Sequence, residues 1–229
     1  MNHKIIPAIM PKTYEELESL TERIAPYVDH VQFDIMDGDF VSDATWPFQN
    51  PDDVFFEGIV HEEDDLPYAD TLSYELDLMV REPAELLAQW KAMKPQSIII
   101  HAASCDNVIE TLQDFQVMRD EDTALGLSMP HGTTYAQMAQ HIPYIDIVQC
   151  MGIKEIGKQG EPFASAVLDQ IQLMRKHFPH IIISVDGSVN KETITDLKDA
   201  GAQRFVVGSA IFGASDVEKA IADLEEYIS

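Results

Sequence analysis

Eight short apolar segments, each followed by a stretch with helical periodicity, constrain the fold of this chain more than any other feature. The apolar segments cover residues 5–9, 28–34, 72–79, 96–101, 124–129, 145–150, 180–185 and 204–207. Strands that alternate with helices pair in parallel through right-handed crossovers, and nearly continuous apolar strands are typical of burial on both faces. Eight such units in 229 residues predict one domain, a single (β/α)8 TIM barrel of the α/β class over residues 1–229.

The helical patterns fill the intervals between these strands. They cover residues 12–26, 51–59, 83–92, from 107 onward, 135–140, 163–177, 190–202 (capped by Asn190) and 214–228. An open doubly wound sheet is the alternative, but no GxGxxG follows the first strand. Two segments break the alternation: the acidic, aromatic-rich residues 42–70, whose role the sequence leaves open, and the Gly- and Lys-rich loop 151–162. Long loops in a compact domain often carry function.

The charge of the chain limits its partners. Forty acidic and fifteen basic residues give a net charge of -25, which repels nucleic acid and anionic lipid. The chain begins without the pattern of a signal peptide and holds no apolar run near the roughly 18 residues of a membrane span. Cys105 and Cys150 lack metal-finger spacing. We therefore expect a cytoplasmic protein with reduced thiols and a small-molecule partner, and the sequence leaves a homo-oligomer open.

Polar residues at the ends of the predicted strands are the candidate site. In a barrel the C-terminal strand ends meet at one mouth, where active sites lie. The acid–base candidates there are Asp34, Asp77, His101 and Asp186. A single strand-end Asp is often only a helix cap, and His101 is as well explained as a buried, hydrogen-bonded side chain, so convergence of Asp34 and Asp186 is the stronger indication.

Two pairs of small residues indicate an anion site at the same mouth. Gly187-Ser188 and Gly208-Ser209 follow the seventh and eighth strands. Small residues there let backbone N–H groups and a helix N-terminus approach a phosphate. Such a site needs no Lys or Arg and so suits an acidic chain, although the same glycines are also ordinary turn residues.

With these motifs in order, the chain resembles the ribulose-phosphate 3-epimerase family. The matching segments are residues 6–10, 33–41, 76–80, 185–190 and 208–212, with Met151 after the sixth strand. The resemblance implies epimerisation of a ketopentose phosphate at carbon 3 through an enediolate, as in D-ribulose 5-phosphate 3-epimerase. It assigns the two acid–base roles to Asp34 and Asp186 and places Met36, Met79 and Met151 around the substrate. In cores, such methionines also serve simply to fill gaps.

The chain departs from the family at its metal ligands. The family holds a divalent ion with two aspartates and two histidines, and the histidine positions are here Gln32 and Asp77; the family's strand-one serine is Ala8. Asp34, Asp186, Asp77 and Gln32 form an all-oxygen set that favours Mg²⁺ or Mn²⁺ over Zn²⁺. The alternative is no metal. Three carboxylates would then repel one another and raise at least one pKa, or Lys154 or Lys158 of the loop would approach them or the substrate phosphate.

Three functions therefore stay open. The first is a sugar-phosphate epimerase with an altered metal preference, an isomerase of carbohydrate metabolism. The second is a catalytically inactive barrel that binds a sugar phosphate, suggested by Ala8 and the missing histidines. The third, a related lyase or isomerase, is disfavoured because Met36 stands where the Asp-x-Lys-x-x-Asp pattern of those lyases has its lysine.

Overall fold

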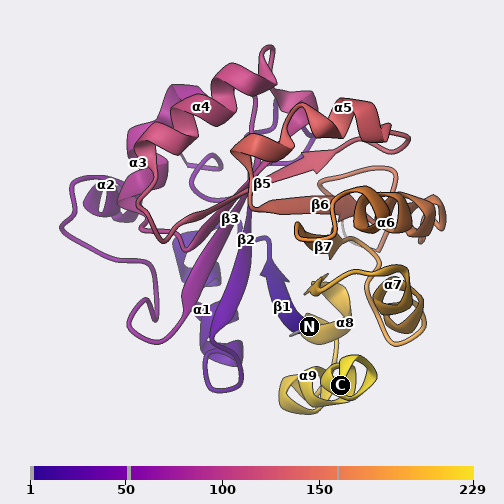
Figure 1. The fold of residues 1–229 in the computed structure, drawn as a ribbon. Helices are drawn as coiled ribbons and strands as arrows, with labels where there is room; N and C mark the ends of the chain where they lie inside the picture. The colour runs from indigo at the N-terminus through magenta and orange to yellow at the C-terminus, as the bar shows by residue number, and fades with distance from the viewer. Residues whose placement is uncertain (1–2, 51–52, 159) are drawn as a thin grey trace.

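A computed structural model describes residues 3–50, 53–158 and 160–229, and its eight parallel strands close into a barrel in chain order (Figure 1). The strands are β1 Lys4–Ile9, β2 His30–Met36, β3 Ser73–Met79, β4 Ser97–His101, β5 Ala124–Met129, β6 Ile147–Met151, β7 Ile182–Asp186 and β8 Arg204–Val207. β1 pairs with both β2 and β8, which completes the ring. The predicted single (β/α)8 barrel is confirmed.

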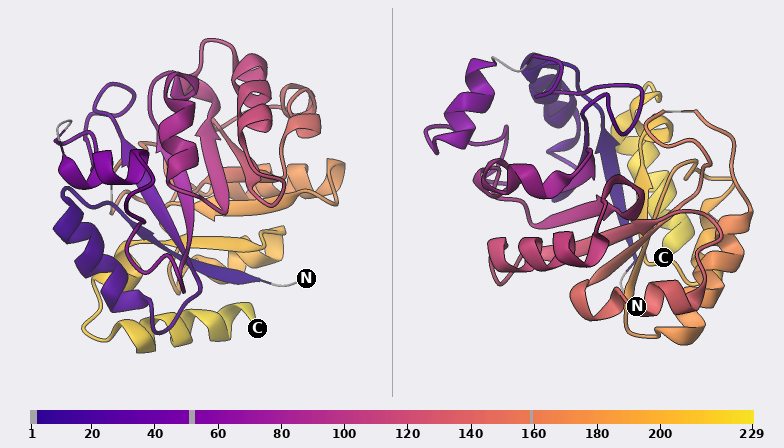
Figure 2. Two further views of the ribbon diagram at one scale, coloured as in Figure 1. Left: turned by 90° about the vertical axis from the view of Figure 1, so that its left-hand side faces the viewer. Right: turned by 90° about the horizontal axis from the view of Figure 1, so that it is seen from above.

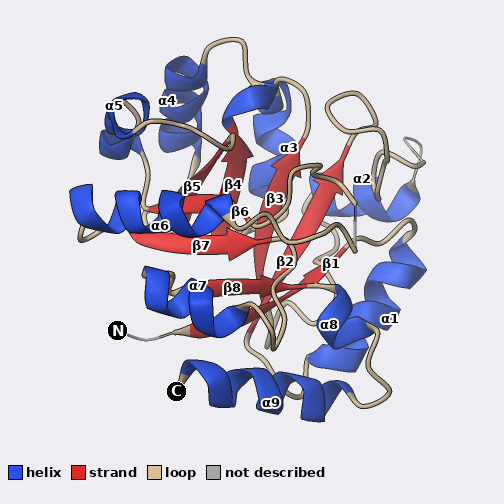
Figure 3. Ribbon diagram, turned by 90° about the vertical axis from the view of Figure 1, so that its right-hand side faces the viewer, coloured by secondary structure: helices blue, strands red, loops and turns tan. Residues whose placement is uncertain are grey.

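The helices form a ring outside the strands, in sequence order around the barrel (Figures 1 and 3). They are α1 Tyr14–Ile24, α2 Val54–Val60, η1 Pro83–Leu86, α3 Leu87–Ala92, η2 Ala102–Ser104, α4 Val108–Met118, α5 Tyr135–Ala139, η3 Ile142–Tyr144, α6 Ala166–His177, α7 Ile194–Ala200, α8 Ser209–Phe212 and α9 Val217–Ile228. The first strand, β1, lies against the last helix, α9 (Figure 2). None of the helices in the described ranges is long and apolar enough to cross a membrane.

Some predicted boundaries were wrong. β2 continues to Met36, so Asp34 lies within the strand and not at its end. α7 begins at Ile194 after Thr193, whereas Asn190 Oδ1 accepts a hydrogen bond from the N–H of Glu192 and caps the preceding turn. The short helix α8 was not predicted. Some predictions concern residues outside the described ranges. These are the start of α2 at Pro51, the first two residues of the chain, and Gln159 of the loop after β6.

The apolar core lies between the strands and the helices. Alternate strand residues such as Phe33, Leu76 and Val185 are fully buried there, together with helix residues such as Leu17 and Phe115. Burial of apolar area of this kind is the main stabilising contribution in a domain. The inner face of the barrel carries a small separate apolar cluster of Ile6, Ala8 and Val206.

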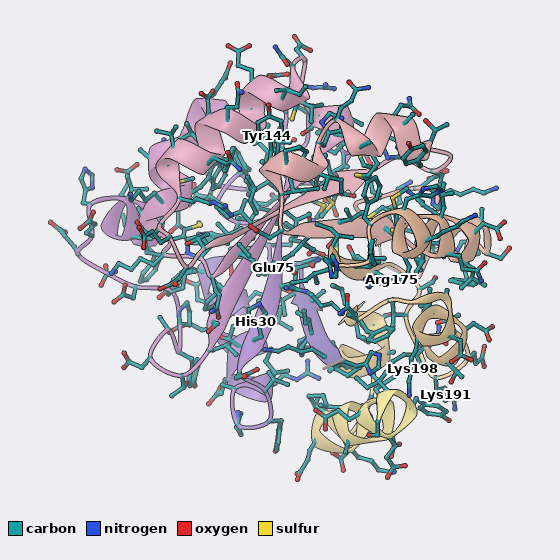
Figure 4. The ribbon with its side chains drawn as sticks, viewed as in Figure 1. His30, Glu75, Tyr144, Arg175, Lys191 and Lys198 are labelled. Carbon is teal, nitrogen blue, oxygen red and sulfur yellow. The ribbon has the colours of Figure 1, made fainter. Side chains whose placement is uncertain are left out.

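Much of the barrel interior is polar, which the nearly continuous apolar strands did not indicate. Arg204 on β8 bonds to Glu75 on β3, and Ser97 Oγ donates to the same carboxylate at 2.6 Å. Strands β3 and β8 are not neighbours, so the Arg204–Glu75 contact crosses the inside of the barrel. Glu75 and the nearby His30 of β2 are labelled in Figure 4. A buried charge is tolerated only when it is paired, and this pair closes the N-terminal end of the barrel.

Candidate active site

A cavity of about 230 Å³ lies at the C-terminal end of the barrel and is bordered by both predicted acid–base residues, Asp34 and Asp186. It also contains residues from the ends of β1, β3, β6, β7 and β8. The predicted residues among them are Met79, Met151, Gly187, Ser188, Gly208, Ser209, Lys158 and Ala8. The convergence that the strand ends predicted is therefore present in the structure.

Hydrogen bonds to the main chain and to the side chain of Asp34 fix its position on β2. The Thr45 hydroxyl donates to the Asp34 carbonyl oxygen at 2.9 Å and accepts from the N–H of Met36 at 2.9 Å, so residues of the long segment 42–70 brace the end of β2. Gln32 Nε2 donates to Asp34 Oδ1 at 2.8 Å. Burial, followed by the negative charges of Asp186 and Asp77, raises the pKa of Asp34 well above its usual value.

Asp186 ends β7, beside Met151 of β6 in the strand register. Burial raises the pKa of Asp186 to about 7, and the nearby carboxylate of Asp77 adds to the effect, while His101 opposes it. The negative charge of Asp186 contributes to the raised pKa of Asp34, and both residues border the same cavity. Burial thus favours the neutral form of each carboxyl group, and the two titrate as a coupled pair.

Asp77 lies within the barrel and does not border this cavity. Its side chain is fully buried. Oδ1 accepts a hydrogen bond from His101 Nε2 at 2.9 Å, and Oδ2 accepts one from Gln149 Nε2 at 3.3 Å. Both carboxylate oxygens of Asp77 thus have protein donors. His101 makes this bond through Nε2 and also lines a neighbouring cavity.

The predicted metal ligands are only partly free to bind an ion. Within the described ranges, no group of three or more His, Cys, Asp or Glu side chains lies close enough together to hold a metal. An amide oxygen is also a possible ligand, and Gln32 Oε1 is buried without a hydrogen-bond partner among the described residues. Two carboxylates and one amide oxygen suit Mg²⁺, which usually binds one or two carboxylates and keeps several waters. They suit Zn²⁺ less well, because its protein sites are rich in nitrogen and sulfur ligands.

The turns after β7 and β8 form the opposite wall of the cavity. Gly187 and Ser188 both have positive φ, 94° and 53°, and the Ser188 hydroxyl donates to the carbonyl oxygen of Glu161 in the loop. A Cβ on Gly152 would lie 2.0 Å from the carbonyl oxygen of Gly187, so only glycine permits this approach of the loop to β7. The loop is thereby held over the glycine turns.

The remaining predicted residues divide between the cavity and its surroundings. Met79 and Met151 border the cavity, whereas Met36 is fully buried against Met79 and Val41 and does not border it. Lys158 borders the cavity and forms an exposed ion pair with Glu155 at 2.9 Å. Lys154 is exposed and borders the neighbouring cavity instead.

Sequence reasoning missed two residues that hold the site together. Gln149 donates to Asp77, and Thr45 braces β2. The signal for Gln149 was its position two residues before Met151, since residues i and i+2 of a strand share a face. Thr45 had no such signal, because it lies in an irregular segment.

This fold and this site define a class of protein: a (β/α)8 barrel enzyme with two carboxyl groups and two glycine turns around one cavity at the mouth. A family profile narrows the class. The ribulose-phosphate 3 epimerase family matches residues 4–212, and the chain belongs to this family. The predicted resemblance and the predicted enzyme class, an epimerase of the isomerases, are confirmed at the level of the family.

Curated relatives agree over nearly the whole chain. The chain is 28% identical to ribulose-phosphate 3-epimerase of Bacillus subtilis (strain 168), an alignment that covers 96% of this chain and 97% of the relative. It is 26% identical to the ribulose-phosphate 3-epimerase of Mycobacterium leprae (strain TN), covering 98% of this chain and 94% of that one.

Solved structures share the fold at lower identity. A 3-keto-L-gulonate-6-phosphate decarboxylase from Vibrio cholerae superposes with a TM-score of 0.74 at 16% identity, covering 100% of this chain and 98% of the other. A 3-hexulose-6-phosphate synthase superposes with a TM-score of 0.65 at 20% identity, covering 99% and 100%. At these identities the likeness concerns the barrel alone.

Proposed function

We propose that this protein epimerises D-ribulose 5-phosphate at carbon 3, with Asp34 and Asp186 as its two acid–base groups. The observation that supports this proposal most strongly is that Asp34 and Asp186 border one cavity, where burial raises the pKa of both carboxyl groups. One carboxylate removes the proton from carbon 3, and the electron pair forms an enediolate across carbons 2 and 3. The other, protonated carboxyl group returns a proton to the opposite face of carbon 3, which inverts its configuration.

The raised pKa values support this division of roles. Burial, with the charges of Asp186 and Asp77, raises the pKa of Asp34 well above its usual range, and burial with the charge of Asp77 raises the pKa of Asp186 to about 7. Raised pKa values favour a protonated carboxyl group in the pair, and either residue can hold that proton at the start of a turnover. A catalytic group works best when its pKa lies near the working pH. The pair exchanges its protonation states in each turnover, so the reverse reaction uses the opposite assignment.

The substrate phosphate is proposed to lie against the turns 187–188 and 208–209. These residues line the cavity beside Asp186 and present small side chains. Backbone N–H groups bind an anion here without adding a cation, which suits a chain with a net charge of -25. Lys158 lies at the edge of the same cavity and is available to the phosphate if its exposed pair with Glu155 opens.

A divalent cation, Mg²⁺ or Mn²⁺ in preference to Zn²⁺, is a further part of the proposal. Asp34, Asp186 and the unpartnered oxygen of Gln32 would hold it, and Asp77 is the predicted ligand most engaged elsewhere. Such an ion supplies positive charge that stabilises the developing enediolate oxygens. The free thiols Cys105 and Cys150 support our proposal that the protein works in the cytoplasm.

A catalytically inactive sugar-phosphate-binding barrel is the second candidate. Ala8 favours it, because this residue lines the cavity where the family has a serine and cannot donate a hydrogen bond. A related lyase is less well supported, because Met36 replaces its lysine and is packed away from the cavity.

Deuterium exchange separates these functions. Ribulose 5-phosphate is incubated with the protein in D₂O, with Mg²⁺, Mn²⁺, Zn²⁺ or a chelator, and carbon 3 is followed by NMR. We expect deuterium at carbon 3 together with formation of xylulose 5-phosphate. Binding of the substrate without exchange under every metal condition would instead support the inactive barrel.

A further inference from the structure

A second cavity of about 350 Å³ adjoins the first at the mouth of the barrel. Its walls come from the ends of β4, β5 and β6 and from the loop that follows β6, with the residues Phe40, His101, Ser128, Met151, Ile153 and Ile156 among them. Met151 and Ile153 also border the cavity that contains Asp34 and Asp186, so the two spaces share one wall. A mostly apolar cavity with a few polar groups is typical of a small-molecule site.

Two buried polar side chains in this cavity lack a full set of partners. Ser128 is 2% exposed, and its hydroxyl has no hydrogen-bond partner among the described residues. His101 is 3% exposed, and Asp77 holds its Nε2, while no hydrogen bond of the described residues engages its Nδ1. His101 and Ser128 are paired in the strand register. A buried hydroxyl without a partner costs free energy, so this position favours an occupant that can supply one.

The second cavity faces the phosphate turns across the mouth. His101 ends β4 and Gly208 follows β8, and these strands are four positions apart in the closed ring of eight. The cavity with Asp34 and Asp186 contains these turns and meets the second cavity at Met151 and Ile153. A substrate whose phosphate rests on the 187–188 and 208–209 turns can therefore extend its other end past this shared wall toward His101 and Ser128.

On the basis of the proposed function, we propose that the second cavity is a subsite for the end of the substrate remote from the phosphate. It extends the activity to 3-ketose 6-phosphates, which carry one more hydroxylated carbon beyond the ketone than ribulose 5-phosphate does. His101 and Ser128 bond the added hydroxyl group, and the apolar wall packs against the C–H groups of the chain.

The length of the sugar decides which class fits. In ribulose 5-phosphate, carbon 3 is separated from the phosphate-bearing carbon by carbon 4, and beyond the ketone only carbon 1 remains. In a 3-ketohexose 6-phosphate, carbon 4 has the same spacing to the phosphate, so it occupies the same place between the carboxyl groups. The proton of carbon 4 passes to one carboxylate, an enediolate forms across carbons 3 and 4, and the second carboxyl group returns a proton to the opposite face.

The test compares two substrates and two matched variants. Deuterium uptake is measured at carbon 4 of D-arabino-3-hexulose 6-phosphate and at carbon 3 of ribulose 5-phosphate. Ser128→Ala removes the hydroxyl from the subsite. Ser184→Ala is the control, because Ser184 is also a fully buried strand serine whose hydroxyl has no partner among the described residues, yet it lines neither cavity.

We expect exchange with both sugars. Ser128→Ala should lower kcat/KM for the hexulose relative to that for ribulose 5-phosphate by about three- to tenfold, the effect of one hydrogen bond. Ser184→Ala should leave this ratio unchanged, and thermal unfolding confirms that both variants are folded. Exchange with ribulose 5-phosphate but none with the hexulose, or equal ratios in the two variants, would overturn the subsite alone. No exchange with either sugar would instead overturn the proposed function on which it rests.

Discussion

His101 and Asp77 form a buried pair inside the barrel, with Nε2 of His101 2.9 Å from Oδ1 of Asp77. The side chains are 4% and 0% exposed. Gln149, from β6 on the other side of the ring, donates to the second oxygen of Asp77 at 3.3 Å. One carboxylate thus joins three strands, β3, β4 and β6, beneath the cavity that contains Asp34 and Asp186. Its removal affects the barrel as well as the site.

Asp77→Ala should reduce the free energy of unfolding by about 3–5 kcal/mol, because it leaves buried donors of His101 and Gln149 without an acceptor. Urea denaturation measures the loss. Asp223→Ala is the contrasting variant, since Asp223 pairs with Lys219 on the surface of α9, and exposed helical pairs of this kind contribute about 0.3–0.5 kcal/mol. Similar losses in both variants would show that the Asp77 network does not stabilise the barrel.

Replacement of either acid–base residue should stop proton exchange at carbon 3. Asp34→Asn or Asp186→Asn removes one of the two proton carriers, and a positioned acid or base contributes about a hundred- to ten-thousandfold to a rate. Deuterium uptake from D₂O measures the effect. Asp39→Asn in the exposed turn after β2 is the control and should keep its rate. A near-normal rate in Asp34→Asn or Asp186→Asn would refute the assignment of that residue.

Gly152→Ala should disrupt the site through a backbone collision. The N–H of Gly152 donates to the Asp186 carbonyl oxygen at 2.6 Å, and an added Cβ would lie 2.0 Å from the Gly187 carbonyl oxygen. The loop must then move from the end of β7. Since small displacements in a catalytic site cost about 100-fold, kcat/KM should fall by that order. Gly132→Ala is strained by its φ of 79° but has no atom within 4 Å of the added Cβ, so it should lose stability and retain activity.

Acid should destabilise the protein through His30. Burial, with the positive charges of Lys4 and Arg204, lowers the pKa of His30 to about 4 in the folded protein, against about 6.5 when unfolded. Below pH 6.5 the unfolded chain therefore binds more protons than the folded protein. The stability that neutral His30 contributes is fully present above that pH and is lost as the pH falls toward 4. Between pH 7 and pH 5 the loss is about 2 kcal/mol.

The comparison variant for this pH effect is His30→Asn, which does not titrate. Urea unfolding at pH 7 and pH 5 gives the difference in stability for each protein, and subtraction cancels the contributions of the carboxyl groups that both share. A difference that is the same in the two proteins would mean that His30 is protonated without cost in the folded barrel.

The barrel and its paired acids were predictable because both follow from local patterns. Alternation of apolar strands with helices fixes the order of elements, and parallel strands bring their C-terminal ends to one mouth, which places Asp34 near Asp186. The contacts of Asp77 were not predictable in this way. Its bond to Gln149 joins strands three positions apart in the ring, and that pairing depends on the tilt and stagger of the closed barrel.

Two further positions show where residue type alone misled. Asn190 is a strong helix-capping residue, but its side chain caps the turn before α7, because three residues separate it from the first helical residue, Ile194. Met36 follows Asp34 by two residues and so shares its face of β2, yet packing against Val41 and Met79 withdraws it from the cavity. Packing in three dimensions decided both positions.

Metal preference is the property of this site that a single residue should change. Dialysis against a chelator should lower the exchange rate, and Mg²⁺ or Mn²⁺ should restore it better than Zn²⁺, because the available donors are oxygens. Gln32→His restores the imidazole that the family has at this position, although it removes the amide that donates to Asp34. We expect this variant to retain more Zn²⁺ after dialysis than the wild type, measured as metal content, and to raise the ratio of Zn²⁺- to Mg²⁺-supported exchange. Equal Zn²⁺ contents in the two proteins would mean that the residue at position 32 does not contact the ion.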